Sequence, residues 1–347
     1  MSIRHDPALD GRIPPPPPRC GSTRRELLAL LASALGAVAL PGAARAQSGA
    51  SVLKIIVGFP AGAGVDLIAR QIAERLRGTY APVVIIENKA GAGGRLAIDA
   101  LKQAPPDGST IMMTPASPLT LYPHIYRKLT YDPVADLAPL TTTHSLKMAL
   151  IAGPGNPASS LADYLVWAKK DEKNGFYATP APGSVPHFIG VMLAKASGVK
   201  LAPVHYRGSA PAWQDLLGSH VPSYISPFGN DAITRHKAGE ARVLAITGTA
   251  RSKALPDVPT FVEAGFKDLA IDEWFGLFAP ARTRPETLAA LAQALRVALQ
   301  SREFVEFLAN YQSEPQISTP AEFAARISSE LDGWAPIVQA SGFTADE

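Results

Sequence analysis

The 347-residue chain has a single cysteine, Cys20, and therefore cannot form an intramolecular disulfide. It also lacks any apolar run of the ~20 residues that a membrane-spanning helix requires. Nucleophile elbows of the form G-x-S-x-G, P-loops and HExxH motifs are missing, and the histidines beyond the first 46 residues show no metal-like short spacing. These absences argue against an integral membrane protein, a common type of serine hydrolase, and a zinc enzyme. They predict no metal and no cofactor.

The first 46 residues have the pattern of a secretory signal peptide. Arg24-Arg25 precede an apolar run, Leu27–Leu40, and the small-x-small triplet Ala44-Arg45-Ala46 follows. The paired arginines favour twin-arginine export, although a general secretory signal that carries two arginines fits the same residues. We expect cleavage after Ala46, a periplasmic location, and no membrane-spanning segment in the mature chain.

The basic character of the full chain comes from this leader. It holds six of the 33 Lys and Arg residues and three of the 30 acidic residues, which leaves 27 of each and a net charge of zero. The mature chain therefore offers no electrostatic case for binding nucleic acid. Cys20 also lies in the leader, so a hydrophobic core alone must hold the remaining ~300 residues, a length that usually forms two domains.

Apolar runs alternate with segments of helical spacing in two successive series, which predicts two α/β lobes. Ser160 with Asp163, and Thr319 with Glu322, have the spacing of helix N-terminal caps. The expected strands are 53–59, 83–87, 110–114, 147–152, 173–178, 202–206, 224–226 and 242–247.

The loop Phe59–Asp66 lies between the first expected strand and its helix, where free backbone N–H groups favour an anion. Asp66 is interpreted as the cap of that helix. The same unit, residues 54–87, also fits an exported nicotinamide-dependent oxidoreductase, because Gly62-x-Gly64 resembles a dinucleotide-binding fingerprint. Against this alternative, Leu67 occupies the third glycine position, where a side chain would obstruct helix–strand packing.

Three further glycine turns precede expected helices, at 88–97, 181–187 and 205–217. In the second, Gly183 and Ser184 suit a carboxylate, and His187 is interpreted as a structural hydrogen-bonding group more readily than as a ligand contact. In the third, Arg207 has two interpretations. Its guanidinium could bind a carboxylate in a bidentate way, or its side chain could simply be exposed to solvent. Backbone-rich loops with few ionisable groups favour binding over catalysis.

Seven segments in this order resemble one family. The mature chain is similar over nearly its whole length to the extracytoplasmic receptors of tripartite tricarboxylate transporters, the Bug family. The segments are GFPAGAGVDLIAR, VVIIENKAGAGGRLAIDALKQAPPDGSTIMM, LTYDPVADLAPLT, GSVPH, VHYRGSAPAWQDLLGSHV, KAGEARVLAITGTARSKALPDVPTFVEAG and the W-x-G-L-x-A-P of 274–280.

The resemblance implies a two-lobed periplasmic-binding-protein fold of type II. Each lobe would be a mostly parallel sheet flanked by helices, with lobe 1 at 47–152 plus 272–347, lobe 2 at 153–271, and a ligand cleft between them. It implies a non-enzymatic receptor for a small di- or tricarboxylate or an aromatic carboxylate, serving a membrane permease; service to a sensor stays open. The implied ligand-binding residues are Phe59, Ala61, Gly62, Thr114, Ser117, Gly183, Ser184, Arg207, Gly208 and Ser226.

Some positions depart from the family pattern. Gly58 replaces a proline, Ala63 replaces the second glycine of a pair, and His205 replaces another proline. Ser226 stands where relatives that bind amino acids carry an aspartate, and this change favours a ligand without a cationic group.

Overall fold

A computed structural model describes residues 51–311, 313 and 315–345. The predicted signal peptide, its cleavage after Ala46, and Cys20 lie outside these ranges. No helix in the described part of the chain combines the length and the apolar character needed to cross a bilayer.

The first sheet has the strand order β2-β1-β3-β10-β4. β1 is parallel to both β2 and β3, whereas β10 runs antiparallel to its two neighbours, so a single strand is reversed. The strands are β1 (Val52–Val57), β2 (Val83–Asn88), β3 (Thr110–Pro115), β4 (Leu137–Leu146) and β10 (Glu273–Pro280).

The second sheet repeats this arrangement with the order β7-β6-β8-β5-β9. β6 is parallel to β7 and β8, and β5 is the reversed strand. The strands are β5 (Met148–Ala152), β6 (Phe176–Thr179), β7 (Ala202–His205), β8 (Ser223–Pro227) and β9 (Arg242–Ile246).

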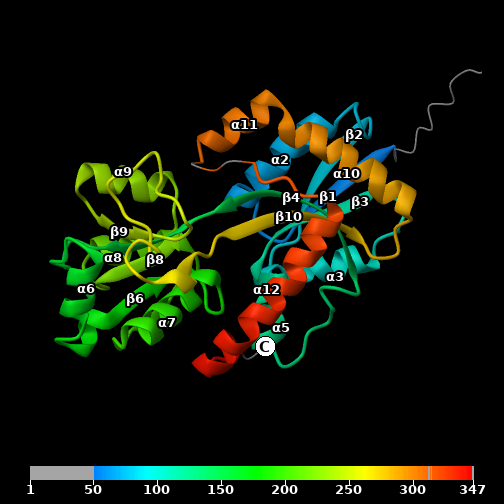
Figure 1. Ribbon diagram of the computed structural model, residues 1–347. Coiled ribbons are helices and arrows are strands. Elements are labelled where there is room, and N and C mark those ends of the chain that lie inside the picture. Colours follow the sequence, from blue (N-terminus) through cyan, green and yellow to red (C-terminus); the bar gives the residue numbers. More distant parts are fainter. Residues whose placement is uncertain (1–50, 312, 314, 346–347) are drawn as a thin grey trace, which may run out of the picture. The chain divides into compact units, whose positions relative to one another are not determined.

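The reversed strand of each sheet is the one that arrives from the other half of the chain. β5 follows β4 directly, and β10 follows the long segment after β9, so two connections cross between the sheets (Figure 1). We call lobe 1 the part that carries the first sheet (51–146 and 273–345) and lobe 2 the part that carries the second (148–271). The sequence placed 148–152 in lobe 1, but as β5 these residues pair with β8 and β9 in lobe 2.

Both faces of the first sheet are covered by helices. One core joins alternate residues of β1 and β3 to α2, α10 and α11, and another joins the intervening residues to α3 and α12. Buried leucine and isoleucine side chains of this kind contribute about 1.5–3 kcal/mol each relative to exposure. The lobe 1 helices are α2 (Gly64–Leu76), α3 (Arg95–Gln103), α4 (Ser117–Thr120), α5 (Tyr122–Ile125), α10 (Pro285–Gln300), α11 (Arg302–Ala309) and α12 (Pro320–Ser341), with the 3₁₀ turn η1 (Ala92–Gly94).

The second sheet carries helices on both faces as well. They are α6 (Leu161–Ala168), α7 (Val185–Ser197), α8 (Ser209–Leu217) and α9 (Asn230–Ala238), with the 3₁₀ turns η2 (Glu172–Gly175) and η3 (Lys267–Leu269). Both predicted caps are confirmed: Ser160 accepts from the N–H of Asp163, and Thr319 and Glu322 form a capping box.

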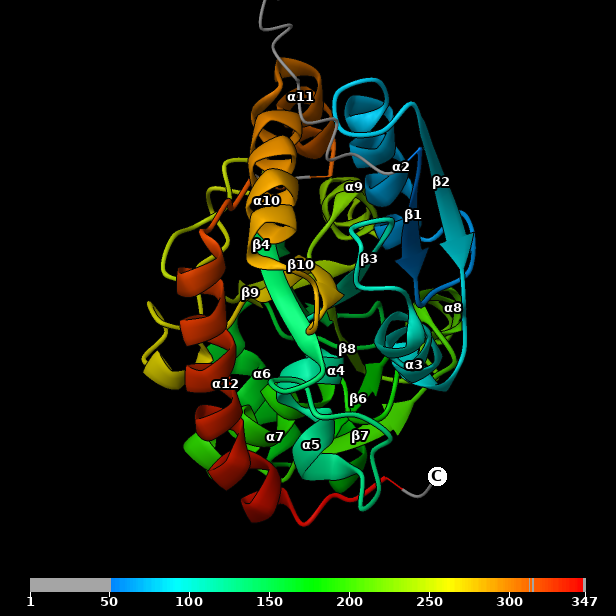
Figure 2. The ribbon, with the colours of Figure 1, turned by 90° about the vertical axis from the view of Figure 1, so that its right-hand side faces the viewer.

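α12 belongs to lobe 1 by its core residues but extends to lobe 2. It packs on β4, α4 and α5, and its C-terminal part reaches α7. α12 and α3 lie on opposite flanks of lobe 1, with α4 and α5 between them (Figure 2).

Candidate functional site

The ten predicted ligand-binding residues lie at equivalent places in the two sheets. Because the sheets share one strand order, β1 corresponds to β6, β2 to β7 and β3 to β8. The predicted residues all follow, or end, one of these parallel strands, and ligands of open α/β sheets bind at the carboxyl ends of such strands. In lobe 1 they are Phe59, Ala61, Gly62, Thr114 and Ser117; in lobe 2 they are Gly183, Ser184, Arg207, Gly208 and Ser226.

The loop after β1 passes very close to the turn before α3. A Cβ atom on Gly58 would lie 2.8 Å from the Cα of Gly94, so only glycine permits this approach of two backbones. The ring of Phe59 lies against Gly94, where an added Cβ would be 3.7 Å from the ring. The departure at Gly58 therefore has a packing reason.

Asp66 holds this loop in place. Its carboxylate is fully buried and accepts hydrogen bonds from the N–H of Gly62 (2.8 Å), Nδ2 of Asn88 (2.9 Å) and Nε of Arg70 (2.9 Å). Asn88 Nδ2 also donates to the carbonyl of Phe59 at 3.0 Å. Burial by itself would raise the pKa of Asp66, but the three donors outweigh it and hold the pKa below its usual value.

This network corrects one interpretation and limits another. The helix N-cap is Ala63, and Asp66 is the third helical residue, so Asp66 is not the cap that the sequence suggested. Gly62 has a left-handed φ of +83° and is exposed, but its N–H is already bonded to Asp66. Ala61 and Gly62 are therefore exposed residues of this loop, but the N–H of Gly62 is not free to bind an anion.

At the end of β3, Thr114 and Ser117 are both buried. Ser117 Oγ donates to Glu273 at 2.8 Å. Burial raises the pKa of Glu273 to about 7; the Ser117 hydrogen bonds oppose this shift and the charge of Glu330 adds to it. Sequence reasoning did not find Glu273, because its environment arises from a strand that returns from lobe 2.

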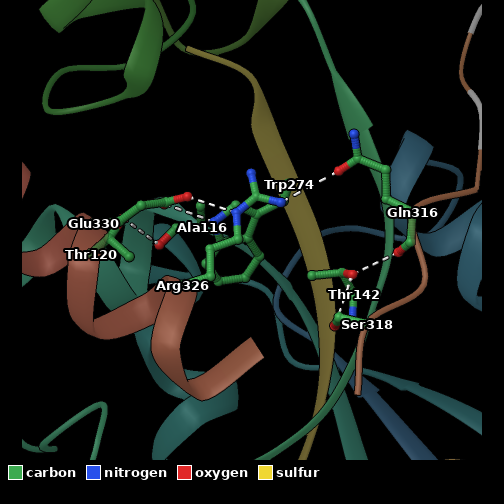
Figure 3. Close-up of polar contacts among 8 residues, drawn as sticks. All are labelled: Ala116, Thr120, Thr142, Trp274, Gln316, Ser318, Arg326 and Glu330. Atoms are coloured by element: carbon green, nitrogen blue, oxygen red, sulfur yellow. Dashed lines mark hydrogen bonds and ion pairs between the residues drawn. The ribbon is translucent and has the colours of Figure 1, made fainter. Parts of the chain in front are cut away.

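Glu330 of α12 is bonded to the residue next to Glu273. Its carboxylate accepts from Nε1 of Trp274 at 2.7 Å and from Nε of Arg326 at 2.8 Å (Figure 3). Arg326 also lies over the Trp274 ring, 5.8 Å from its centroid.

In lobe 2, the loop after β6 places Gly183 against lobe 1. Gly183 is buried with a left-handed φ of +67°, and a Cβ added to it would lie 3.2 Å from Ile125 of α5. Ser184 is the N-cap of α7, but its hydroxyl donates to the carbonyl of Ala181 at 2.7 Å. The structural interpretation of His187 fits its contacts: Nδ1 accepts the N–H of Gly183 at 3.2 Å.

The loop after β7 presents a free cation. Arg207 is exposed and makes no hydrogen bond or ion pair with the described residues. Gly208 is the N-cap of α8 with φ +105°, and its N–H donates to the carbonyl of Pro180. Ser226, at the end of β8, is buried, and its hydroxyl donates to the adjacent carbonyl of Pro227 at 3.1 Å. His205 is exposed, and its Nδ1 lies 2.8 Å from Oγ1 of Thr179.

A series of contacts connects some of the predicted residues of lobe 1 to lobe 2. Phe59 contacts Gly94, the Tyr122 hydroxyl donates to Gly93 at 3.3 Å, and Ile125, at the end of the same short helix, meets Gly183 of lobe 2. Arg207, Gly208 and Ser226 make no hydrogen bond to lobe 1 within the described residues.

A cavity of about 1700 Å³ lies elsewhere, on the α12 flank. It is lined by α7 with His187, by the segment 265–273 with Glu273, by α12 and by the following Gly342 and Phe343, but by none of the ten predicted residues. The cavity does include Ala116 and Val185, the chain neighbours of the predicted Ser117 and Ser184.

The comparisons with known proteins agree with this architecture. Residues 68–343 match the family described as the tripartite tricarboxylate transporter family receptor, TctC. The chain belongs to this family, whose members are solute-binding receptors and not enzymes, so the predicted family and the prediction of a non-enzyme are confirmed.

Individual relatives cover most of the chain. Protein BugT of Bordetella pertussis is 31% identical over 292 residues, which are 84% of this chain and 89% of BugT. The solved structure of the periplasmic binding protein BugD is 28% identical with a TM-score of 0.74, covering 85% of this chain and 99% of that one. The Rhodopseudomonas palustris protein Rpa4515, solved with adipate, is 27% identical with a TM-score of 0.74, covering 84% and 97%. The predicted two-lobed fold is confirmed.

The oxidoreductase alternative is overturned by family membership. Its counter-argument from Leu67 was itself mistaken, because the Leu67 side chain is 36% exposed and does not enter the helix–strand interface. The occupied Gly62 N–H is a better physical objection, since a pyrophosphate would need that donor.

Proposed function

We propose that this chain is a periplasmic receptor that closes around a small organic dicarboxylate at the strand ends of its two lobes. Three helices begin there without an acidic residue in their first turn: α3, α7 and α8. No side chain caps any of the three in the described structure, so the positive dipole end of each helix is left without a carboxylate partner of its own. The first N–H of α3, that of Arg95, already bonds to the carbonyl of Ala92, and Pro186 in the first turn of α7 has no N–H, so at these two ends the support is the dipole more than free donors. α2 differs, because Asp66 lies in its first turn.

The distribution of these helix ends supports two carboxylates in one ligand. α3 belongs to lobe 1, whereas α7 and α8 belong to lobe 2, so each lobe offers its own anion-binding end. Arg207 adds an uncommitted guanidinium beside α8, suited to a bidentate carboxylate contact. Ser226 places no negative charge at the end of β8, which fits a ligand without an amine. The adipate in the Rpa4515 structure is a ligand of this class.

A membrane permease is the partner that we propose. The family's description as a transporter receptor supports a permease over a sensor, and the leader 1–46 supports delivery to the periplasm. Deleting residues 1–46 should keep the protein in the cytoplasm, and fractionation of cells that express both forms tests this.

Thermal-shift and calorimetric titration of the purified mature chain test the ligand class. Adipate, succinate, malate and citrate, with benzoate as an aromatic carboxylate, should be compared with acetate and with 1,6-diaminohexane. Binding to the native state raises the free energy of unfolding by RT ln(1 + [L]/Kd), about 2.7 kcal/mol at one hundred times Kd. Stabilisation by a dicarboxylate and not by acetate supports the proposal. Stabilisation by the diamine alone, or by none of these compounds, overturns it.

A further inference from the structure

The segment that follows α12 connects the two lobes. Gly342 ends the helix in the left-handed conformation, with φ +66°, and the chain then turns towards α5. The N–H of Ala345 donates to the carbonyl of Ile125 at 3.1 Å, and Ala345 forms a parallel bridge with Tyr126. This end of the segment is therefore fixed to lobe 1.

Between these two points, the ring of Phe343 enters lobe 2. It packs edge-to-face on His187, with centroids 4.6 Å apart and an interplanar angle of 84°, and it lies 6.1 Å from Phe188. A Cβ atom on Gly183 would be 3.5 Å from Phe343 Cε1. Phe343 thus packs on the histidine that binds the Gly183 N–H, and its ring lies beside Gly183 itself.

His187 links Phe343 to the loop through a hydrogen bond. Its side chain is 3% exposed, and because Nδ1 accepts the N–H of Gly183, the ring proton is on Nε2. Burial, with a smaller effect of His205, lowers the pKa of His187 to about 4, so the ring is neutral and Nδ1 remains an acceptor at physiological pH. The conformation of Gly183 therefore depends on the orientation of this ring, which packs edge-to-face against Phe343 and also contacts Phe188 and His205.

We propose that residues 342–345 form a strap between the lobes, and that Phe343 is the positioning residue that holds the Gly183–Ser184 loop through His187. Nothing in the sequence patterns of the loop itself indicated this role. The proposal rests on the proposed function only for the expected change in ligand affinity, since the conformation of the loop can be measured without ligand.

The strap differs from an ordinary packing contact because one end is bonded to lobe 1 and the other packs in lobe 2. A residue that only filled the core of lobe 2 would have no reason to be fixed to α5 of lobe 1. Here the Ala345–Ile125 hydrogen bond and the Phe343–His187 contact are two residues apart in the chain. A movement of lobe 1 against lobe 2 is therefore transmitted to the Gly183 loop.

Amide hydrogen exchange tests the positioning role directly. In Phe343→Ala, the Gly183 amide should exchange at least about tenfold faster than in the wild type, because its acceptor loses a fixed orientation. Phe343→Tyr should restore slow exchange. Ile327→Ala is the matched control: Ile327 is a buried residue of α12, the helix before the strap, and packs only in lobe 1, so the variant should lose stability without changing Gly183 exchange. Equal Gly183 exchange in Phe343→Ala and the wild type overturns the proposal.

Ala345→Pro tests the attachment to lobe 1, because proline lacks the N–H that donates to Ile125. We expect the Gly183 amide of this variant to exchange at a rate between those of the wild type and Phe343→Ala. A rate equal to that of the wild type would overturn the two-ended strap.

With adipate as the probe, Phe343→Ala should bind about tenfold more weakly, since the binding-competent conformation of the loop is less populated. If the wild type does not bind adipate, the proposed ligand class is wrong, but the exchange measurements still test the strap.

Discussion

The N–H of Gly62 donates to the buried carboxylate of Asp66 at 2.8 Å, so the glycine loop after β1 is closed upon its own helix. Asn88, at the end of the neighbouring strand, donates to the same carboxylate and to the carbonyl of Phe59. One buried charge thus joins the loop, the helix and the next strand. Under the proposed function, the ligand's carboxylates would therefore bind at the helix ends that carry no acid.

Replacing Asp66 by alanine should destabilise the protein by about 2–3 kcal/mol, because buried donors lose a charged acceptor. Asp163 provides a matched control, since it occupies the same third position of α6 but is exposed. Asp163→Ala should cost only about 0.5–1 kcal/mol. Urea unfolding at pH 7 measures both variants, and equal losses would contradict a special role for the buried carboxylate.

The lowered pKa of Asp66 gives this contribution a pH dependence. A carboxylate with a lower pKa in the folded state stabilises the fold above its unfolded pKa of ~3.9, and the contribution disappears as pH falls further. The difference in unfolding free energy between the wild type and Asp66→Ala should therefore be constant near neutrality and shrink below about pH 4.

Glu273 predicts a pH dependence of opposite sign. Its pKa is raised from 4.5 to about 7 in the folded state, so the native protein binds more protons than the unfolded chain between these values. The stability that this proton provides is complete below pH 4.5 and is lost as pH rises towards 7. Glu273→Gln keeps an acceptor for Ser117 without the charge, and should become progressively more stable than the wild type over this range.

Thermal unfolding of the two proteins at several pH values between 4.5 and 8 measures this difference. Glu74→Gln is the control, because Glu74 is an exposed partner of Arg77 and should show no such trend. Parallel melting temperatures for the wild type and Glu273→Gln across the range would contradict a raised pKa of this half-buried acid.

The backbone approach at Gly58 predicts a contrast between two glycines of one loop. A Cβ on Gly58 meets the Cα of Gly94 at 2.8 Å, whereas a Cβ on Gly64 meets nothing within 4 Å. Gly58→Ala should therefore cost about 1–3 kcal/mol through overpacking. Gly64→Ala should be neutral or stabilising by up to about 1 kcal/mol, because alanine favours the helix. Denaturant titration of both variants checks the contrast, and two equal effects would contradict it.

Local signals in the sequence predicted the strand–loop–helix units and two helix caps. Ser160 and Thr319 are recognisable because a cap depends on residues three positions apart. The family resemblance supplied the two-lobed fold. The position of β5 in the second sheet was not predictable locally, since an apolar strand does not indicate which sheet it enters.

The same limit applies to the candidate site. Gly62 was predicted to face the ligand, but its N–H belongs to Asp66, whose role depends on Asn88 from the adjacent strand. Glu273 acquires its raised pKa only where β10 returns beside Ser117. Phe343 lies 156 positions from His187 in the chain, and no spacing pattern connects them. These long-range relationships arise in the folded chain.

Arg207 gives the prediction that isolates ligand binding from stability. Its side chain is exposed and bonded to no described residue, so Arg207→Gln should leave the urea midpoint unchanged. If the guanidinium binds one carboxylate of the ligand, adipate affinity should fall about 10- to 100-fold, the effect of losing a charge-assisted bidentate contact. Arg282→Gln, which removes an exposed arginine from the loop after β10, is the matched control and should bind adipate as the wild type does. Calorimetry at low and high salt should show a weaker salt dependence in Arg207→Gln, because the screened attraction has been removed. Unchanged affinity in this variant would remove Arg207 from the site and leave the helix ends of lobe 2 to bind the carboxylate alone.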